Sequence, residues 1–332
     1  MKLKNYNVLL YYLFTPIDEP EEFAKDHKAF MNALNLKGRV LIAKEGINGT
    51  LSGKKKDTIA YMEAMKKDLR FEKMVFKIHE EENNAFRKLY CKVRDSIITL
   101  EENDDVDPNQ IVGEYLNPKQ WRQMLEKDDV IVLDGRNGYE YDIGHFRGAL
   151  RPDITNFKEF PEWIDENLGD QKDKPIMAYC TGGIRCEKLT GVLLNKGFTN
   201  VFHLEGGIVT YGQDEDVKGD LWDGKCYVFD DRISVPINQI EDIIVSKCIH
   251  CGTLSDRYIN CTNDDCHLQH ISCQACEESL EGFCSEECSE YIRTHPGRDA
   301  RVRLEQKVKL YESYGQTHRK AKEAKELYNK NI

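Results

Sequence analysis

A cysteine and an arginine with two glycines between them lie in residues 179–187, which read Tyr-Cys-Thr-Gly-Gly-Ile-Arg-Cys-Glu. The apolar run before Cys180 predicts a buried strand over residues 175–179, and the spacing of leucine and valine predicts a helix over residues 187–196. Backbone N–H groups of the loop and the positive end of the helix can then surround the sulfur. Arg185 adds a permanent positive charge. Together they favour the thiolate, which is the nucleophilic form of cysteine.

The loop around this cysteine defines a candidate active site, with Cys180 and Arg185 as its catalytic residues. Its other members are Thr181, Gly182, Gly183, Ile184 and Cys186. Cys186 is either a packed residue in the first helical turn or a second thiol that attacks an oxidised Cys180. We expect the sulfur to be open to solvent at the edge of its domain. Tyrosine phosphatases have a similar cysteine-to-arginine loop, so the loop alone predicts anion or sulfur chemistry.

A second group of reactive residues lies in residues 243–295, a Cys-rich region that holds four close pairs of cysteines. The pairs are Cys248 and Cys251, Cys261 and Cys266, Cys273 and Cys276, and Cys284 and Cys288. Each pair can supply two corners of a zinc tetrahedron, so the segment predicts two structural zinc ions. Interleaved and sequential pairing are both open, and His250, His267 or His270 could replace a cysteine. An iron–sulfur cluster is the rival metal.

The composition limits the classes of protein that can be considered. Hydrophobic residues make up 40% of the 332 residues and charged residues 32%, which predicts a globular chain of two or three domains. No apolar run approaches the ~20 residues of a membrane span, and no signal peptide is found. We therefore expect a cytoplasmic protein with reduced cysteines and no membrane partner.

The net charge of −11 is unevenly distributed. Residues 297–332 contain ten Lys and Arg against five Asp and Glu, and they predict a basic C-terminal helix. A basic tail on an acidic body favours an anionic partner such as RNA, although the charges could equally pair along a solvated helix.

The elements of residues 1–100 predict a ferredoxin-like α+β domain with a split βαβ order. We expect strands over residues 5–14, 38–43, 50–52, 74–79 and 88–98, and helices over residues 20–36 and 54–69. Residues 44–49 predict a tight turn because they include two glycines and an asparagine. An acidic, solvated linker is expected over residues 101–110. Basic side chains that could form one face are Lys37, Arg39, Lys44, Lys54, Lys55, Lys56, Arg87, Lys88, Lys92 and Arg94.

Residues 111–240 predict an α/β domain with a parallel sheet. The strand expected over residues 130–133 is wholly apolar, as in sheets that helices cover on both faces. It ends at Asp134, and Arg136 follows two residues later. An Asp–Arg pair at a strand end can support the neighbouring loop through charge-assisted hydrogen bonds.

Several motifs of this domain resemble those of rhodanese domains. The pattern of Asp134, Arg136, Glu140, Gly144, His145, Gly148 and Ala149 is similar to the segment upstream of the rhodanese cysteine. Residues 180–185 are similar to the rhodanese active-site loop, and residues 204–207 to the segment after the next strand. The upstream segment is foreign to phosphatases, so the resemblance favours a rhodanese domain.

Over nearly its full length the chain resembles the bacterial rhodanese-like tRNA uridine hydroxylase family. The resemblance rests on Lys-Glu-Gly-Ile-Asn-Gly-Thr at residues 44–50, Cys-Thr-Gly-Gly-Ile-Arg-Cys-Glu at residues 180–187 and the Cys-rich region. It implies an oxidoreductase that uses molecular oxygen to hydroxylate C5 of the wobble uridine in the tRNA anticodon, with Cys180 as the active-site residue. We find no flavin or nicotinamide motif. The alternatives are a sulfurtransferase that carries a persulfide on Cys180 and a non-enzymatic zinc module.

Overall fold

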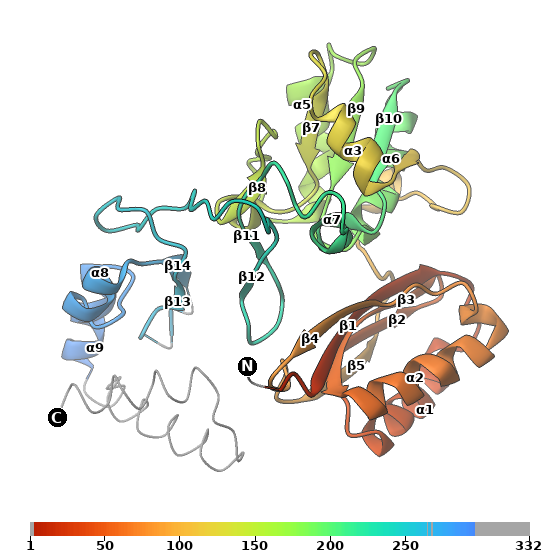
Figure 1. Cartoon of the computed structure of the whole chain (residues 1–332), viewed down its shortest axis with the longest axis horizontal. Coiled ribbons are helices and arrows are strands. Elements are labelled where there is room, and N and C mark those ends of the chain that lie inside the picture. The colour runs from red at the N-terminus through yellow and green to blue at the C-terminus, as the bar shows by residue number, and fades with distance from the viewer. Residues whose placement is uncertain (1–2, 264, 267, 296–332) are drawn as a thin grey trace. The chain divides into compact units, whose positions relative to one another are not determined.

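The computed structural model describes residues 3–263, 265–266 and 268–295. The chain forms two compact units, Met1–Ile244 and Val245–Ile332, and the first contains both the N-terminal domain and the rhodanese-like domain. No helix among the described residues is long and apolar enough to cross a membrane. The fold is a mixed α/β architecture, as predicted (Figure 1).

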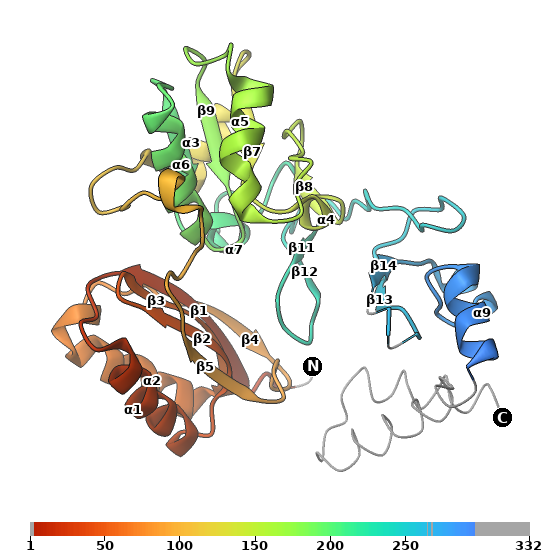
Figure 2. The same cartoon turned by 180° about the vertical axis from the view of Figure 1, so that it is seen from behind.

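The N-terminal domain is a five-stranded sheet with two helices on one face (Figures 1 and 2). The strand order is β4-β1-β3-β2-β5, and every pair is antiparallel except β2 with β5. The strands are β1 (Tyr6–Phe14), β2 (Lys37–Ala43), β3 (Gly46–Lys54), β4 (Lys77–Glu81) and β5 (Leu89–Val93), and the helices are α1 (Pro20–Ala33) and α2 (Lys55–Lys67). The first four strands have the predicted ferredoxin-like order, and β5 extends the sheet next to β2.

Successive side chains on a strand point to opposite faces of a sheet, and the two faces of this sheet have different surroundings. Leu9 and Tyr11 of β1 belong to the core beneath the helices, where the Tyr11 and Tyr61 hydroxyls lie 2.5 Å apart. Leu10 and Tyr12 belong to the opposite face, which we call the open face of the sheet. The helices leave this face free to contact another part of the chain.

A tight turn joins β2 and β3 as predicted, but it is shorter than the predicted residues 44–49. Strand β3 begins at Gly46, which pairs with Ala43 of β2, so only Lys44 and Glu45 connect the two strands. The glycines are needed for close approach to β1. A Cβ on Gly46 would lie 2.1 Å from the Leu13 carbonyl oxygen, and one on Gly49 would lie 2.3 Å from the Tyr11 ring.

The rhodanese-like domain is built on a four-stranded parallel sheet with the order β6-β10-β9-β7. The strands are β6 (Glu114–Leu116), β7 (Ile131–Asp134), β9 (Ile176–Tyr179) and β10 (Val201–Leu204). Helices α5 (Phe160–Leu168) and α6 (Ile184–Asn195) pack on one face, and α3 (Pro118–Met124) and α7 (Gly207–Gln213) on the other. All four residues of β7 and of β9 are buried, as expected of a sheet covered on both faces.

A small antiparallel sheet, β12-β11-β8, adjoins the parallel one. It contains β8 (Gly144–Phe146), β11 (Trp222–Tyr227) and β12 (Ser234–Pro236), and the short helix α4 (Gly138–Tyr141) precedes β8. Single 3-10 turns occur at Leu69–Phe71, Glu102–Asp104 and Phe157–Glu159. The β11–β12 hairpin reaches the N-terminal domain, where Arg87 Nε donates to Asp231 at 3.2 Å.

The linker between the two domains is more buried than its acidic sequence predicts. Leu100 and Val106 are 7% and 8% exposed and belong to the core of the rhodanese-like domain. Asp105 accepts a hydrogen bond of 2.6 Å from the buried Lys188. The linker therefore packs against the rhodanese-like domain as well as connecting the two domains.

The second unit contains the Cys-rich region. Its elements are β13 (Tyr258–Asn260), β14 (Gln269–Ile271), α8 (Gln274–Ser279) and α9 (Glu286–Thr294), and β13 pairs antiparallel with β14. The predicted basic helix over residues 297–332 lies outside the described residues. The domain bounds 1–100, 111–240 and 243–295 remain predictions.

Candidate active site

Cys180 lies directly after β9, at the start of the loop that leads into α6. The backbone N–H of Gly183 donates to the Cys180 sulfur at 3.1 Å. Gly183 precedes α6 with a φ of 103°, a left-handed conformation that favours glycine. The helix begins at Ile184, three residues earlier than the sequence predicted, so its N-terminal turn is part of the loop. The predicted arrangement of cysteine, loop and helix is therefore present.

The surroundings of Cys180 favour its thiolate. Burial is the largest single influence and raises the pKa. The Cys186 thiol, the Arg185 guanidinium and the N–H groups of Cys186 and Gly183 oppose burial, and together they lower the pKa from 9.0 to about 5. The sulfur is therefore ionised at neutral pH.

Cys186 occupies the packed position, which is one of the two alternatives that the sequence left open. It is fully buried in the first turn of α6. Burial raises its own pKa, and the adjacent thiolate raises it further, so Cys186 keeps its proton. The protonated thiol can donate a hydrogen bond to the Cys180 sulfur. No structural observation tests whether Cys186 resolves an oxidised Cys180.

Glu140 holds Arg185 in place. The two Arg185 amino groups donate to the two Glu140 carboxylate oxygens at 2.7 and 2.9 Å. Glu140 is fully buried at the third position of α4, and Arg185 also donates to the Thr181 hydroxyl at 3.4 Å. The sequence placed Glu140 within a family pattern without a function for it. The two-point contact fixes the guanidinium beside the loop.

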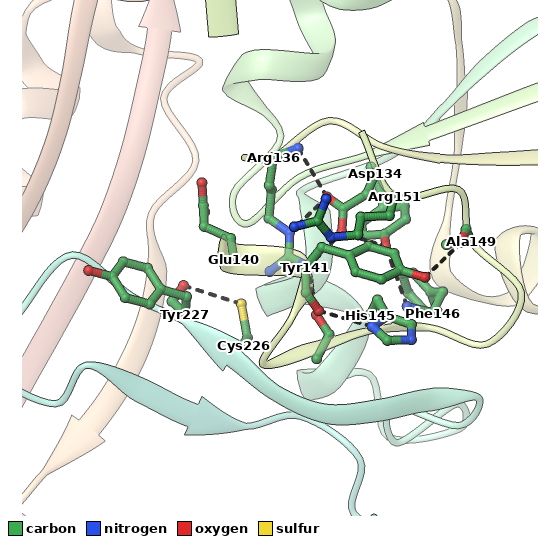
Figure 3. A network of polar contacts seen from close by, with 12 residues as sticks. Asp134, Arg136, Glu140, Tyr141, His145, Phe146, Ala149, Arg151, Cys226 and Tyr227 are labelled. Atoms are coloured by element: carbon green, nitrogen blue, oxygen red, sulfur yellow. Dashed lines mark hydrogen bonds and ion pairs between the residues drawn. The ribbon is translucent and has the colours of Figure 1, made fainter. Parts of the chain in front are cut away.

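The predicted pair of Asp134 and Arg136 forms at the end of β7 (Figure 3). Both side chains are fully buried, and Arg136 donates to Asp134 at 2.8 Å through Nε and at 2.6 Å through Nη2. The Tyr179 hydroxyl, one residue before Cys180, donates to Asp134 at 2.7 Å. Gly135 N–H donates to the Tyr179 carbonyl at 2.7 Å. The pair is thus linked to the end of the strand that carries Cys180.

Other members of the upstream pattern are structural. Figure 3 shows His145 beside Tyr141, whose carbonyl oxygen lies 2.9 Å from His145 Nδ1. The Tyr141 and His145 rings stack with centroids 3.8 Å apart. The Gly144 carbonyl accepts a 2.7 Å bond from Arg136. These contacts shape the segment around the ion pair and do not reach the sulfur.

The prediction that the sulfur is open to solvent is wrong: Cys180 is only 1% exposed. The open face of the N-terminal sheet covers the loop. A Cβ on Gly182 would lie 2.8 Å from the Leu10 side chain, and one on Gly183 would lie 2.7 Å from the Tyr12 hydroxyl. The Lys77 amine of β4 donates to the Gly182 carbonyl at 2.7 Å. Sequence reasoning missed these residues because they belong to another domain.

The N-terminal domain also binds the first turns of α6. The buried Glu187 carboxylate accepts hydrogen bonds of 2.7 Å from Tyr12 and 2.6 Å from Tyr115. Lys188, also buried, lies 2.9 Å from Glu45 in an ion pair. Glu45 of the motif at residues 44–50 therefore contacts the residue that directly follows the motif at residues 180–187, which their separation in the sequence could not show.

The eight cysteines of the second unit form two groups of four. Within each group the sulfur atoms lie within 4.8 Å of one another. One group consists of Cys248, Cys251, Cys273 and Cys276, and the other of Cys261, Cys266, Cys284 and Cys288. This is the interleaved arrangement. No histidine of the described ranges belongs to either group, and His267 lies outside those ranges. Four sulfur ligands leave no open position, which is typical of structural zinc.

Comparison with known families agrees with this architecture. Residues 6–97 match a family described as "UPF0176 acylphosphatase like domain", and residues 117–214 match "Rhodanese-like domain". Residues 223–289 match "Rhodanase C-terminal". The parallel sheet, the Cys180 loop and these matches define a multidomain rhodanese-like protein.

Curated relatives cover nearly the whole chain. A Shouchella clausii protein named tRNA uridine(34) hydroxylase is 52% identical over 294 residues, which are 88% of this chain and 90% of that protein. A Bacillus licheniformis protein of the same name is 53% identical over 89% of this chain and 90% of its own length. A Staphylococcus saprophyticus protein of that name is 49% identical over 93% of this chain and 98% of its own length. The chain belongs to the tRNA uridine(34) hydroxylase family.

Proposed function

We propose that this protein hydroxylates C5 of the wobble uridine in tRNA, with molecular oxygen as co-substrate and Cys180 as the catalytic nucleophile. The observation that carries this proposal is the identity of about 50% with proteins named tRNA uridine(34) hydroxylase over about nine tenths of the chain. The geometry of the loop supports the role of Cys180, because its sulfur is ionised and held beside a guanidinium.

A thiolate can activate uracil by adding to C6, the ring carbon next to the one that is hydroxylated. The addition makes C5 electron-rich, and C5 then adds O2 to give a C5 hydroperoxide. An external two-electron reductant, with two protons, breaks the O–O bond, which releases water and leaves a hydroxyl group on C5. Loss of the C5 proton and expulsion of the sulfur restore the aromatic base. A thiolate with a pKa of about 5 is a good leaving group, so the same environment supports both addition and release.

The groups around Cys180 either act on its sulfur or hold the residues that do. Arg185 and the Gly183 N–H stabilise the negative sulfur before addition and after expulsion. Glu140 fixes Arg185, and the pair of Asp134 and Arg136 supports the strand that carries Cys180. A cysteine persulfide or sulfenate at Cys180 would use the same groups.

The proposed partner is the anticodon region of tRNA. An anticodon base lies in a single-stranded loop, so it can leave its stack and enter a protein site. Because the sulfur is buried, the contacts that Leu10 and Tyr12 make with the loop have to loosen before a base can reach it. Phosphate contacts would make tRNA affinity fall steeply as the salt concentration rises.

The two groups of four cysteines are the proposed sites of two structural zinc ions. Each ion would be held by four thiolates and would stabilise the small second unit, which has few buried apolar side chains. We assign these ions no part in the reaction.

The decisive experiment is mass spectrometry of tRNA nucleosides from cells that lack the protein. Cells complemented with the intact chain should contain 5-hydroxyuridine or its derivatives, and cells with Cys180→Ser should not. Cys226→Ser is the matched control, since Cys226 is equally buried in the same domain but its pKa is raised to about 11. Restoration of the modification by Cys180→Ser would refute the assigned role.

A sulfurtransferase that carries a persulfide on Cys180 is the second candidate, favoured by the match of residues 117–214 to the rhodanese-like family. Rapid formation of thiocyanate from thiosulfate and cyanide by the purified protein would support it. A chain that restores tRNA hydroxylation and lacks this activity would exclude it.

A further inference from the structure

A cavity of about 410 Å³ lies beside the active-site loop within the first unit. One wall is the open face of the N-terminal sheet, with Leu10 and Lys77. The opposite walls come from α7 and from the β11–β12 hairpin, with Val209 and Phe229, and Thr181 of the loop borders the cavity. Its volume is in the roughly 300–1,000 Å³ range of small-molecule sites.

The chemistry of these walls suits a flat ligand with carbonyl edges. Most of the exposed lining surface is apolar and includes Val8, Leu10 and Ile237. Basic side chains also line the cavity, and they are Lys4, Lys77, His79 and Arg232. The charge of Arg232 is held by Asp230 at 2.6 Å and by Glu81 at 3.2 Å. A mainly apolar surface with polar side chains at its border can hold the flat ring of a heterocycle and bind the heteroatoms at its edge.

Phe229 supplies an aromatic surface at this cavity. It follows β11 and is 52% exposed, so one face of the ring is accessible. Its ring packs edge to face on the buried Tyr227, with centroids 5.1 Å apart, so the ring is supported from one side. Proteins that bind single-stranded RNA stack unpaired bases on such exposed rings.

Lys77 supplies the polar contact. Its amine donates one hydrogen bond to the Gly182 carbonyl and lies 4.9 Å from the centre of the Tyr12 ring. An ammonium group has three N–H donors, so the contact with Gly182 uses only one of them. Burial lowers the pKa of Lys77 to about 8 against the opposing charges of Cys180 and Glu187, and the amine is mostly protonated at neutral pH.

We propose that this cavity receives the unstacked pyrimidine of a single-stranded RNA, with its ring on Phe229 and a carbonyl oxygen bound by Lys77. The inference rests on the proposed function and assigns the place where the target base binds. Uracil fits because it presents two carbonyl oxygens on a flat ring. The cavity meets the loop at Thr181, next to the cysteine proposed to react with the base.

Binding of an RNA hairpin tests this assignment without turnover. The probes are a fluorescent anticodon hairpin with uridine at the wobble position and the same hairpin with an abasic site there, measured by anisotropy with the full chain. The intact protein should prefer the uridine hairpin by at least about 5- to 100-fold, which is the usual effect of stacking one base on an aromatic ring, and the Lys77 contact should add to it. Equal affinity for the two hairpins would overturn the proposal.

Substitutions identify the residues that read the base. Phe229→Ala should lower the preference for the uridine hairpin by about 5- to 100-fold and leave affinity for the abasic hairpin unchanged. Leu69→Ala, which removes an apolar side chain that is 88% exposed elsewhere, should change neither. Two results would contradict stacking of the base on this ring. In one, Phe229→Ala binds both hairpins as tightly as the intact chain does, and in the other its affinity for both hairpins falls equally.

The same two hairpins test Lys77. They distinguish a contact with the base, which affects only the uridine hairpin, from a structural role, which affects both hairpins. Lys77→Met should weaken the uridine hairpin about 10- to 100-fold more than the abasic one, and Lys77→Arg should restore part of the difference. A general loss of structure would weaken both hairpins equally, and that result would reject Lys77 as the base contact. Because binding is measured without hydroxylation, an inactive protein that still prefers uridine would refute the proposed function alone.

Discussion

The low pKa of Cys180 predicts a pH dependence of stability that Cys180→Ser should remove. The folded-state pKa is about 5, and an unfolded cysteine has a pKa of about 8.5. Because the folded value is the lower one, the thiolate stabilises the fold fully above the unfolded pKa. This stabilisation is lost as the pH falls toward 5. Between the two pKa values the free energy of unfolding rises by about 1.4 kcal/mol per pH unit. The free energy of unfolding of the intact chain should therefore rise by about 2.5 kcal/mol more than that of Cys180→Ser between roughly pH 5.5 and 7.5.

Urea unfolding under reducing conditions measures this difference. All three tryptophans lie in residues 121–222, so their fluorescence reports on the domain that carries Cys180. Cys226→Ser is the control, because burial raises the pKa of Cys226 to about 11 and the thiol stays neutral over this range. The difference in free energy of unfolding between Cys226→Ser and the intact chain should not change with pH. A difference for Cys180→Ser that is equally flat would show that the sulfur is not held as a thiolate.

Three further predictions follow from the contacts around the loop and the cysteine groups. Glu140→Gln leaves the buried Arg185 without its carboxylate and should cost about 3–5 kcal/mol in urea unfolding, and adding Arg185→Met should recover part of that loss. Gly207 and Gly148 have φ values of 70° and 78°, so alanine strains the backbone at both positions. Gly207→Ala also places a Cβ 2.5 Å from the Cys180 carbonyl oxygen and should abolish hydroxylation, whereas Gly148→Ala meets no atom within 4 Å and should retain it. A strong chelator should release about two zinc ions per chain, measured by elemental analysis. It should also unfold the second unit, measured by circular dichroism. Release of iron in place of zinc would favour an iron–sulfur cluster.

The elements that hold Cys180 could be predicted because their signals are local. The apolar runs before Asp134 and Cys180 predicted β7 and β9, and the glycines after Cys180 predicted the loop. The ion pair of Asp134 and Arg136 also followed from neighbours in the sequence. In each case the interacting residues lie within a few positions of one another, so spacing carries the information.

The cover over the loop could not be predicted because it depends on contacts between distant residues. Lys77 and Gly182 are 105 residues apart, and Tyr12 and Glu187 are 175 apart. Alternation along β1 shows that Leu10 and Tyr12 share a face, but it cannot show what that face contacts. The prediction that the Cys180 sulfur is exposed was therefore wrong, although the predicted elements of its own domain were correct.

The glycines of residues 46–49 and the cysteine pairs show two further limits. Glycine favours both turns and close backbone approach, and the structure uses Gly46 and Gly49 for the second purpose. The spacing of the cysteines fits either order of pairing. The interleaved order depends on a contact across the unit, in which Ile249 N–H donates to the Ile271 carbonyl at 3.0 Å and brings the first and third pairs together.

The interleaving of the cysteine groups has a consequence for biosynthesis. A ribosome delivers the chain from its amino end, so the first group of four is complete only after Cys276 has emerged. By then Cys261 and Cys266 are already present without Cys284 and Cys288. A premature stop between residues 277 and 283 would leave one finished set of ligands and one half-set on the same product. Such a fragment could fill only one of its two metal sites and would lack α9, so part of the second unit would stay unfolded.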